Sequence, residues 1–224
     1  AVAAPLQGRL ADQWGQRLVL LAASTLYSVG VAAIILQAGS SLGLTMAAAV
    51  LAGTGAPQTG NMVRTRWTHS ISDRQLLSTA FAWEAILDEV VFIIGPVLVT
   101  FLTLNVHSSL GLLSAAASAL IGGWGLAFQQ STAPRPIRES RQTKEPLALV
   151  PLGALVVSAL GVGFVFGASE VLIVAFTDEQ GQKTLAGWVL AVSAIGSLLA
   201  GFVVGSRTTV GSPLKRLRIF TVLL

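Results

Sequence analysis

Apolar stretches of about 20 residues, each long enough to cross a bilayer as a helix, alternate with short polar segments along this chain. Six of them are complete, and they cover residues 18–37, 43–62, 76–104, 109–128, 147–175 and 184–205. Residues 1–6 and 218–224 are also apolar and resemble truncated helices, so we expect an internal fragment of a longer protein. The pattern predicts an all-α, multi-pass transmembrane bundle with about six complete helices and two partial ones.

The composition excludes an ordinary water-soluble domain. Hydrophobic residues make up 53% of the 224 residues and charged residues only 11%, whereas about a quarter of the residues in soluble domains are charged. The chain has no cysteine, which excludes disulfides and thiolate chemistry. It also lacks a Walker loop, an HExxH motif and a Gly-x-Ser-x-Gly motif. We therefore expect no enzyme, no metal and no cofactor.

The positive charges indicate how the chain crosses the membrane. Thirteen of the 14 lysines and arginines lie in segments 7–17, 64–74, 129–146 and 206–218. Two predicted helices separate each segment from the next, so all of them fall on one side. Cytoplasmic loops carry an excess of Lys and Arg, so these segments are predicted to be cytoplasmic in a plasma-membrane protein. The pI of 10.3 is thus explained without a nucleic-acid partner.

A polar run from Gly8 to Arg17 reads G-R-L-A-D-Q-W-G-Q-R. Its pattern, G-x-L-A-D-x-x-G-x-R, resembles the cytoplasmic loop between the second and third helices of the major facilitator superfamily. In that family the loop is a conformational latch. The resemblance implies a latch made by Gly8, Arg9, Asp12, Gly15 and Arg17. It also implies that Asp12 contacts a neighbouring helix end or a basic residue such as Arg64 or Arg66.

The resemblance also implies a division of the chain into two halves. If the opening loop follows helix 2, the complete spans are helices 3 to 8, and segment 129–146 lies where the family has its central connector. Residues 201–207 and 213–216 weakly repeat the opening loop. The predicted units are 1–128 (end of helix 2 to helix 6), the connector 129–146, and 147–224 (helix 7 to the start of helix 9).

Four acidic residues lie inside predicted spans, where a charge costs on the order of 2.5–3.5 kcal/mol and therefore usually faces the bundle interior. They are Glu84, Asp88, Glu89 and Glu170. Glu84 and Asp88 are about 40° apart on a helical wheel and share one face, so one of them is expected to hold a proton near neutral pH. Glu89 is expected to meet a different helix.

These acids also have a purely structural interpretation. They would then bond to Gln58, to Asn61, to each other or to a loop arginine. Trp83 has two interpretations as well: it stacks on a solute or binds a cation by its face, or it packs against neighbouring helices.

Two small-residue motifs resemble parts of the family's helices. Gly53-Thr54-Gly55-Ala56 resembles the stretch of the fourth helix where close backbone approach lets helices slide. Gly95-Pro96 resembles the Gly-Pro signature of the fifth helix of exporters and is expected to kink its span. One departure is Ala49, which stands where proton-linked exporters have an arginine.

Together these observations predict a secondary active transporter that moves a small solute by alternating access, as a monomer in the lipid bilayer. Proton-coupled export is favoured because of the acids and the Gly-Pro helix. An uptake permease of the same superfamily, and a non-transporting scaffold or channel, remain the alternatives.

Overall fold

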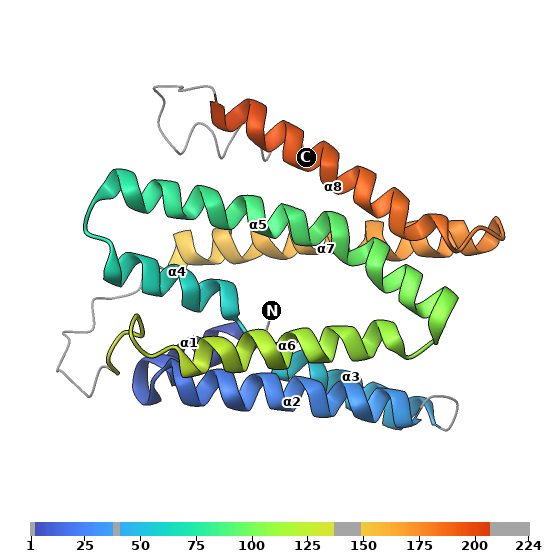
Figure 1. The fold of residues 1–224 in the computed structure, drawn as a ribbon, viewed down its shortest axis with the longest axis horizontal. Helices are drawn as coiled ribbons and strands as arrows, with labels where there is room; N and C mark the ends of the chain where they lie inside the picture. Colours follow the sequence, from blue (N-terminus) through green and yellow to red (C-terminus); the bar gives the residue numbers. More distant parts are fainter. Residues whose placement is uncertain (1–2, 38–40, 137–148, 207–224) are drawn as a thin grey trace.

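All regular structure in the described residues, 3–37, 41–136 and 149–206 of this computed structural model, is helical (Figure 1). The helices are α1 (Ala4–Trp14), α2 (Gln16–Gln37), α3 (Leu42–Gly55), α4 (Thr59–Ser70), α5 (Arg74–Phe101), α6 (Leu110–Phe128), α7 (Leu149–Glu179) and α8 (Leu185–Ser206), with a π-helical turn η1 (Leu102–Val106) after α5. Within these residues, the segments long and apolar enough to span a membrane are Gln16–Gln37, Arg74–Asn105, Leu110–Phe128 and Val156–Glu179. The prediction of an all-α membrane bundle is confirmed.

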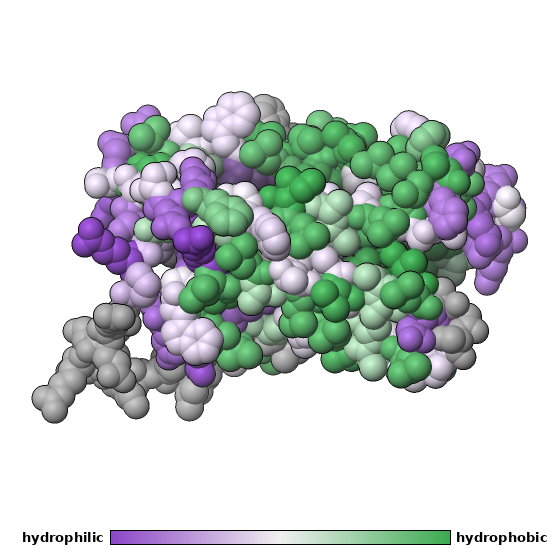
Figure 2. Space-filling view, turned by 60° about the horizontal axis from the view of Figure 1, so that its bottom comes forward, coloured by the Kyte–Doolittle hydropathy of each residue, from purple (hydrophilic) through white to green (hydrophobic). Residues whose placement is uncertain are grey.

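The helices run side by side along the long axis of the molecule (Figure 1). α2 packs tightly against α3 and α6, and α5 packs against α8. α4 lies between these two groups and contacts both α5 and α6. A broad apolar band with hydrophilic regions at both ends is visible in Figure 2. This distribution matches a bundle whose middle lies in lipid and whose ends lie in water.

Close backbone approach explains how α2 and α3 pack. A Cβ atom on Gly55 would collide with the backbone of Tyr27, and one on Gly30 would collide with the backbone of Ala52. A side chain at either position would push the helices apart. Gly55 therefore permits the close approach of α3 to α2, whereas a Cβ on Gly53 would meet nothing within 4 Å.

The second predicted span, 43–62, is not one continuous helix. α3 ends at Gly55 and α4 begins at Thr59. Pro57 has no N–H to donate and forces the preceding residue out of the helical region; Ala56 accordingly has a ψ of 112°. The predicted span ran through this break because it was drawn from the hydropathy pattern, which does not register the missing N–H donor of Pro57.

Two segments expected as loops are mostly helical. α1 runs through the polar motif as far as Trp14, and only Gly15, with a φ of 87°, makes the turn into α2. Gly8 is an ordinary helical residue rather than part of the reversal. Likewise α4 continues to Ser70, so much of the basic segment 64–74 is helical. Polar residues end an apolar span but do not by themselves end a helix, so both helices continue into these segments.

The remaining boundaries agree closely with the predictions. α5 begins after Asp73, whose side chain accepts a hydrogen bond from the N–H of Leu76 at 2.8 Å and caps the helix. Pro96 lies inside α5, and the helix changes direction along its length (Figure 1). α7 continues to Glu179 and takes up part of the expected acidic link. Residues 137–146 of the predicted connector and the basic segment 207–218 lie outside the described residues.

Candidate functional site

One arginine joins the two carboxylates that the sequence places on one face of α5. The Nε of Arg64, on α4, donates to Oε1 of Glu84 at 3.0 Å. The Nη2 of Arg64 lies 3.5 Å from Oδ2 of Asp88. Residues four apart on a helix point the same way, which is why one guanidinium reaches both acids. Among the structural alternatives, contact with an arginine is the one formed, although this arginine is in a helix rather than a loop.

Glu84 differs from its two neighbours in burial. Its side chain is 10% exposed, whereas those of Arg64 and Asp88 are about half exposed. Oε2 of Glu84 is buried and has no hydrogen-bond partner among the described residues. A buried polar oxygen without a donor is costly, so Oε2 of Glu84 is the unsatisfied atom of this cluster. With both acids ionised, two negative charges face one positive charge, and the cluster has a formal charge of −1.

The other intramembrane candidates lie apart from this cluster. Glu89 is directed toward α8, where the Oγ of Ser197 donates to its Oε1 at 3.5 Å, as expected for an acid that meets a different helix. Trp83 is 63% exposed, so it does not pack tightly within the described bundle. Glu170 is exposed on α7. In the described part of the chain, no group of acidic and histidine side chains is arranged to hold a metal ion.

A second arginine, Arg66, organises the end of the molecule where α2 begins and α6 ends. Its Nε donates to Oε1 of Gln16 at 2.8 Å, and its two terminal nitrogens donate to the carbonyl oxygens of Gln129 at 2.6 Å and Leu126 at 2.9 Å. Carbonyls at a helix C-terminus lack partners within the helix and attract cations. Arg66 is only 4% exposed, and this burial lowers its pKa from the ordinary value of arginine.

The family model of the Major Facilitator Superfamily matches residues 1–224, which is the whole chain. The chain belongs to this superfamily. Its members are membrane transporters for small solutes rather than enzymes, so the chain is part of such a transporter. No curated protein and no solved structure matches it.

The motif 8–17, for which the sequence predicts a latch, lies beside the Arg66 network. A Cβ atom on Gly15 would lie 3.3 Å from Cγ of Pro136, and the guanidinium of Arg17 lies 5.5 Å from the ring centroid of Phe128, a cation–π contact. Among the described residues Asp12 forms no ion pair. The expected link from Asp12 to Arg64 or Arg66 is therefore not formed here, because both arginines have other partners.

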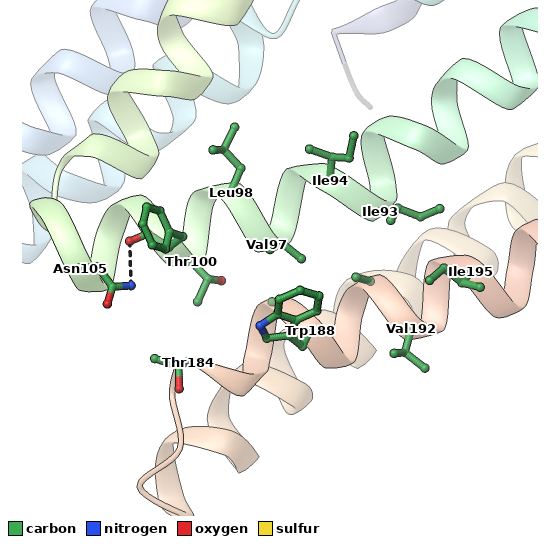
Figure 3. Close-up of a pocket in the computed structure, with 13 residues that line it drawn as sticks. Ile93, Ile94, Val97, Leu98, Thr100, Asn105, Thr184, Trp188, Val192 and Ile195 are labelled. Atoms are coloured by element: carbon green, nitrogen blue, oxygen red, sulfur yellow. Dashed lines mark hydrogen bonds between the residues drawn. The ribbon is translucent and has the colours of Figure 1, made fainter.

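The transporter also has an apolar groove of about 570 Å³ between α5 and α8 (Figure 3). Val97 and Ile94 of α5 and Trp188 and Val192 of α8 line it. The two helices come close because Gly187 has no side chain: a Cβ there would lie 2.8 Å from the carbonyl oxygen of Pro96. Gly95, which the sequence singled out together with Pro96, has open space around it instead.

Sequence reasoning missed the roles of Arg64, Arg66 and Gly187. Arg64 and Arg66 were assigned to a loop and named as partners of Asp12, and an unspecified loop arginine was only one of several partners considered for the acids. Their helical spacing was the available signal, since residues two apart on a helix point in opposite directions. Gly187 carried no signal, because one glycine in a glycine-rich span does not indicate which helix will pack against it.

Proposed function

We propose that the transporter exports a small solute in exchange for protons, and that Glu84, with Asp88 beside it, binds and releases the proton. The observation that carries this proposal is the buried, unpartnered Oε2 of Glu84. Glu84 is ten residues into α5, about 15 Å along the helix at 1.5 Å per residue, and thus well inside an apolar span. A carboxylate retained at such a depth is usually functional.

The charge around Glu84 supports the same proposal. Arg64 neutralises only one of the two facing carboxylates, so uptake of one proton would make the cluster electrically neutral. Moving a neutral cluster within a low-dielectric region costs less free energy than moving a charged one. Loading and unloading a proton could therefore accompany the change between inward-open and outward-open states.

We also propose that residues 1–128 and 147–224 form the two moving halves, joined by segment 129–146. Within the described residues the main contact between them is α5 against α8. In this proposal the end that carries Arg17, Arg66 and Arg74 faces the cytoplasm of a plasma-membrane protein, since basic residues prefer that side. The latch motif 8–17 is at the same end, where it would hold the halves in one state.

The test is a proton-flux assay on the full-length transporter in inverted membrane vesicles with an acidified lumen. A panel of amino acids, sugars, organic acids and aromatic amines is added outside, and a pH-sensitive dye reports proton release from the lumen. We expect at least one solute to cause saturable alkalinisation that an uncoupler abolishes. Glu84→Gln should abolish it, and Asp88→Asn should reduce it, because Asp88 is exposed and shares the same arginine.

Asp178→Asn is the matched control, since Asp178 pairs with Lys183 at 2.9 Å in an exposed turn away from the site. This variant should keep wild-type flux. Solute accumulation with unchanged lumenal pH would contradict proton coupling, and solute movement only from the lumen outward would indicate an uptake permease. Flux that never saturates would indicate a channel.

A further inference from the structure

Two arginines hold α4 from opposite sides. Arg64 and Arg66 are about 200° apart on the helix, so one faces α5 and the other faces α2 and α6. Arg66 is buried and forms three hydrogen bonds shorter than 3.0 Å, to Gln16, Leu126 and Gln129. Arg64 is half exposed, and its hydrogen bonds and ion pairs to described residues are those with the two carboxylates. α4 is therefore held firmly to α2 and α6 and more weakly to α5.

The connection between α4 and α5 depends on one residue. Across the residues that the structure describes, the contacts of Arg64 with Glu84 and Asp88 are the only hydrogen bonds or ion pairs that join the two helices beyond their connecting turn. At its other end α5 continues through the π-helical turn η1 toward α6. π-Helical segments interrupt the regular hydrogen-bond ladder and often occur at functional sites. α5 is thus fixed to the α2/α6 group at η1 and by Arg64.

We infer that Arg64 is a proton-controlled clasp between α4 and α5, which closes when Glu84 is ionised and opens when Glu84 takes up a proton. This inference rests on the proposed function and names the residue through which the proton acts on the helices. A proton bound at Oε2 removes the negative charge that holds the guanidinium. Arg64 then retains only Asp88, which is exposed and more distant, at 3.5 Å.

Within residues 3–37, 41–136 and 149–206, no other charged group replaces Glu84 as a partner of Arg64. The charged side chain that faces Glu84 from α4 is Arg64, and the one on α5 itself is Asp88. Glu89 is directed toward Ser197 of α8. α6 and α8 contain no ionisable residues in their sequences. Arg66 faces the opposite side of α4, and its hydrogen bonds to described residues all go to neutral oxygens, which do not respond to protonation of Glu84.

The experiment measures the distance between α4 and α5 in the full-length transporter, reconstituted in lipid nanodiscs. Asn61→Cys on α4 and Leu87→Cys on α5, both at exposed positions, are spin-labelled after any cysteines elsewhere in the protein are removed. Pulsed electron spin resonance then gives the distance distribution at neutral and at acidic pH. We expect a short distance to dominate at neutral pH and a longer one at acidic pH.

Two variants decide the role of Arg64. Glu84→Gln and Arg64→Gln should each show the longer distance at both pH values, because either change removes the buried ion pair. Asp178→Asn, which breaks the exposed pair with Lys183, should keep the wild-type distances and their pH response. Using both variants keeps the test decisive if one of them fails to fold.

The inference that Arg64 is a clasp is wrong if both Glu84→Gln and Arg64→Gln keep the wild-type distances and their pH response. The distance measurement and the flux assay together distinguish failure of the clasp inference from failure of the proposed function. If flux is proton-coupled and lost in Glu84→Gln while the distances stay unchanged, the function holds and the clasp fails. If the distances respond to pH and to both substitutions while flux is insensitive to an uncoupler, the clasp holds and proton coupling fails.

Discussion

Replacing Arg66 by leucine should destabilise the transporter substantially without touching the carboxylate cluster. The substitution removes three short hydrogen bonds, of 2.6, 2.8 and 2.9 Å, to Gln129, Gln16 and Leu126, and a weak one of 3.5 Å to Thr132. A hydrogen bond contributes about 1 kcal/mol net, so the expected loss is about 3 kcal/mol. Relief of the buried charge works in the opposite direction, but the acceptors that lose their donor remain in a buried site.

The measurement is equilibrium unfolding of the full-length transporter in mixed detergent micelles, followed by tryptophan fluorescence. Arg9→Leu is the matched control, because Arg9 is exposed and forms no hydrogen bond or ion pair with a described residue. It removes the same charge and should change the free energy of unfolding by less than about 0.5 kcal/mol. Arg66→Lys should lie between the two, since an ammonium keeps the charge but not the planar fork that reaches separate acceptors.

The effect of Arg66→Leu should also be the same at neutral and acidic pH. Arginine remains protonated throughout this range even with a lowered pKa, and the oxygens that it contacts do not titrate. Equal stability of Arg66→Leu and Arg9→Leu would refute the idea that Arg66 anchors α4. A destabilisation that disappears at acidic pH would show that an unrecognised carboxylate is its partner.

Two further predictions concern packing and the latch. Gly30→Ala should cost about 1–3 kcal/mol, because its Cβ would collide with the backbone of Ala52; Gly53→Ala, at an open position, should cost nothing in the same unfolding assay. Asp12→Asn should lower solute turnover without changing stability, since Asp12 is exposed and unpaired among the described residues. Normal turnover in that variant would remove the latch role from Asp12.

Helix positions could be predicted wherever a span is apolar and lacks proline. α2 and α6 end at Gln37 and Phe128, as the hydropathy pattern indicated. The break around Pro57 was missed because the hydropathy pattern does not depend on whether a residue has an N–H donor. The proline in Gly55-Ala56-Pro57 itself indicated that the helix would be interrupted there. The helical extension of α4 through its basic residues was missed for the opposite reason: polarity was taken as the end of a helix.

The candidate site was only partly predictable. A shared face for Glu84 and Asp88 follows from helical spacing alone. Their partner, Arg64, depends on how α4 returns beside α5, which the breaks at Pro57 and Asp73 decide. The expected partner of Asp12 came from a family resemblance, and a resemblance does not specify which contacts exist in one conformation. Sequence therefore located the acids and allowed an arginine as a partner, but it did not identify that partner as Arg64.

The contrast between Arg64 and Arg66 shows why residue type alone cannot assign a role in this helix. Arg66 contacts neutral oxygens, whose ability to accept hydrogen bonds is independent of pH, and it is buried. Arg64 contacts carboxylates, whose charge a single proton removes, and it is half exposed. A cation that binds non-titrating acceptors can only stabilise, whereas one that binds titrating acceptors can also respond to a proton gradient. The chemistry of the partner thus separates the anchor from the clasp.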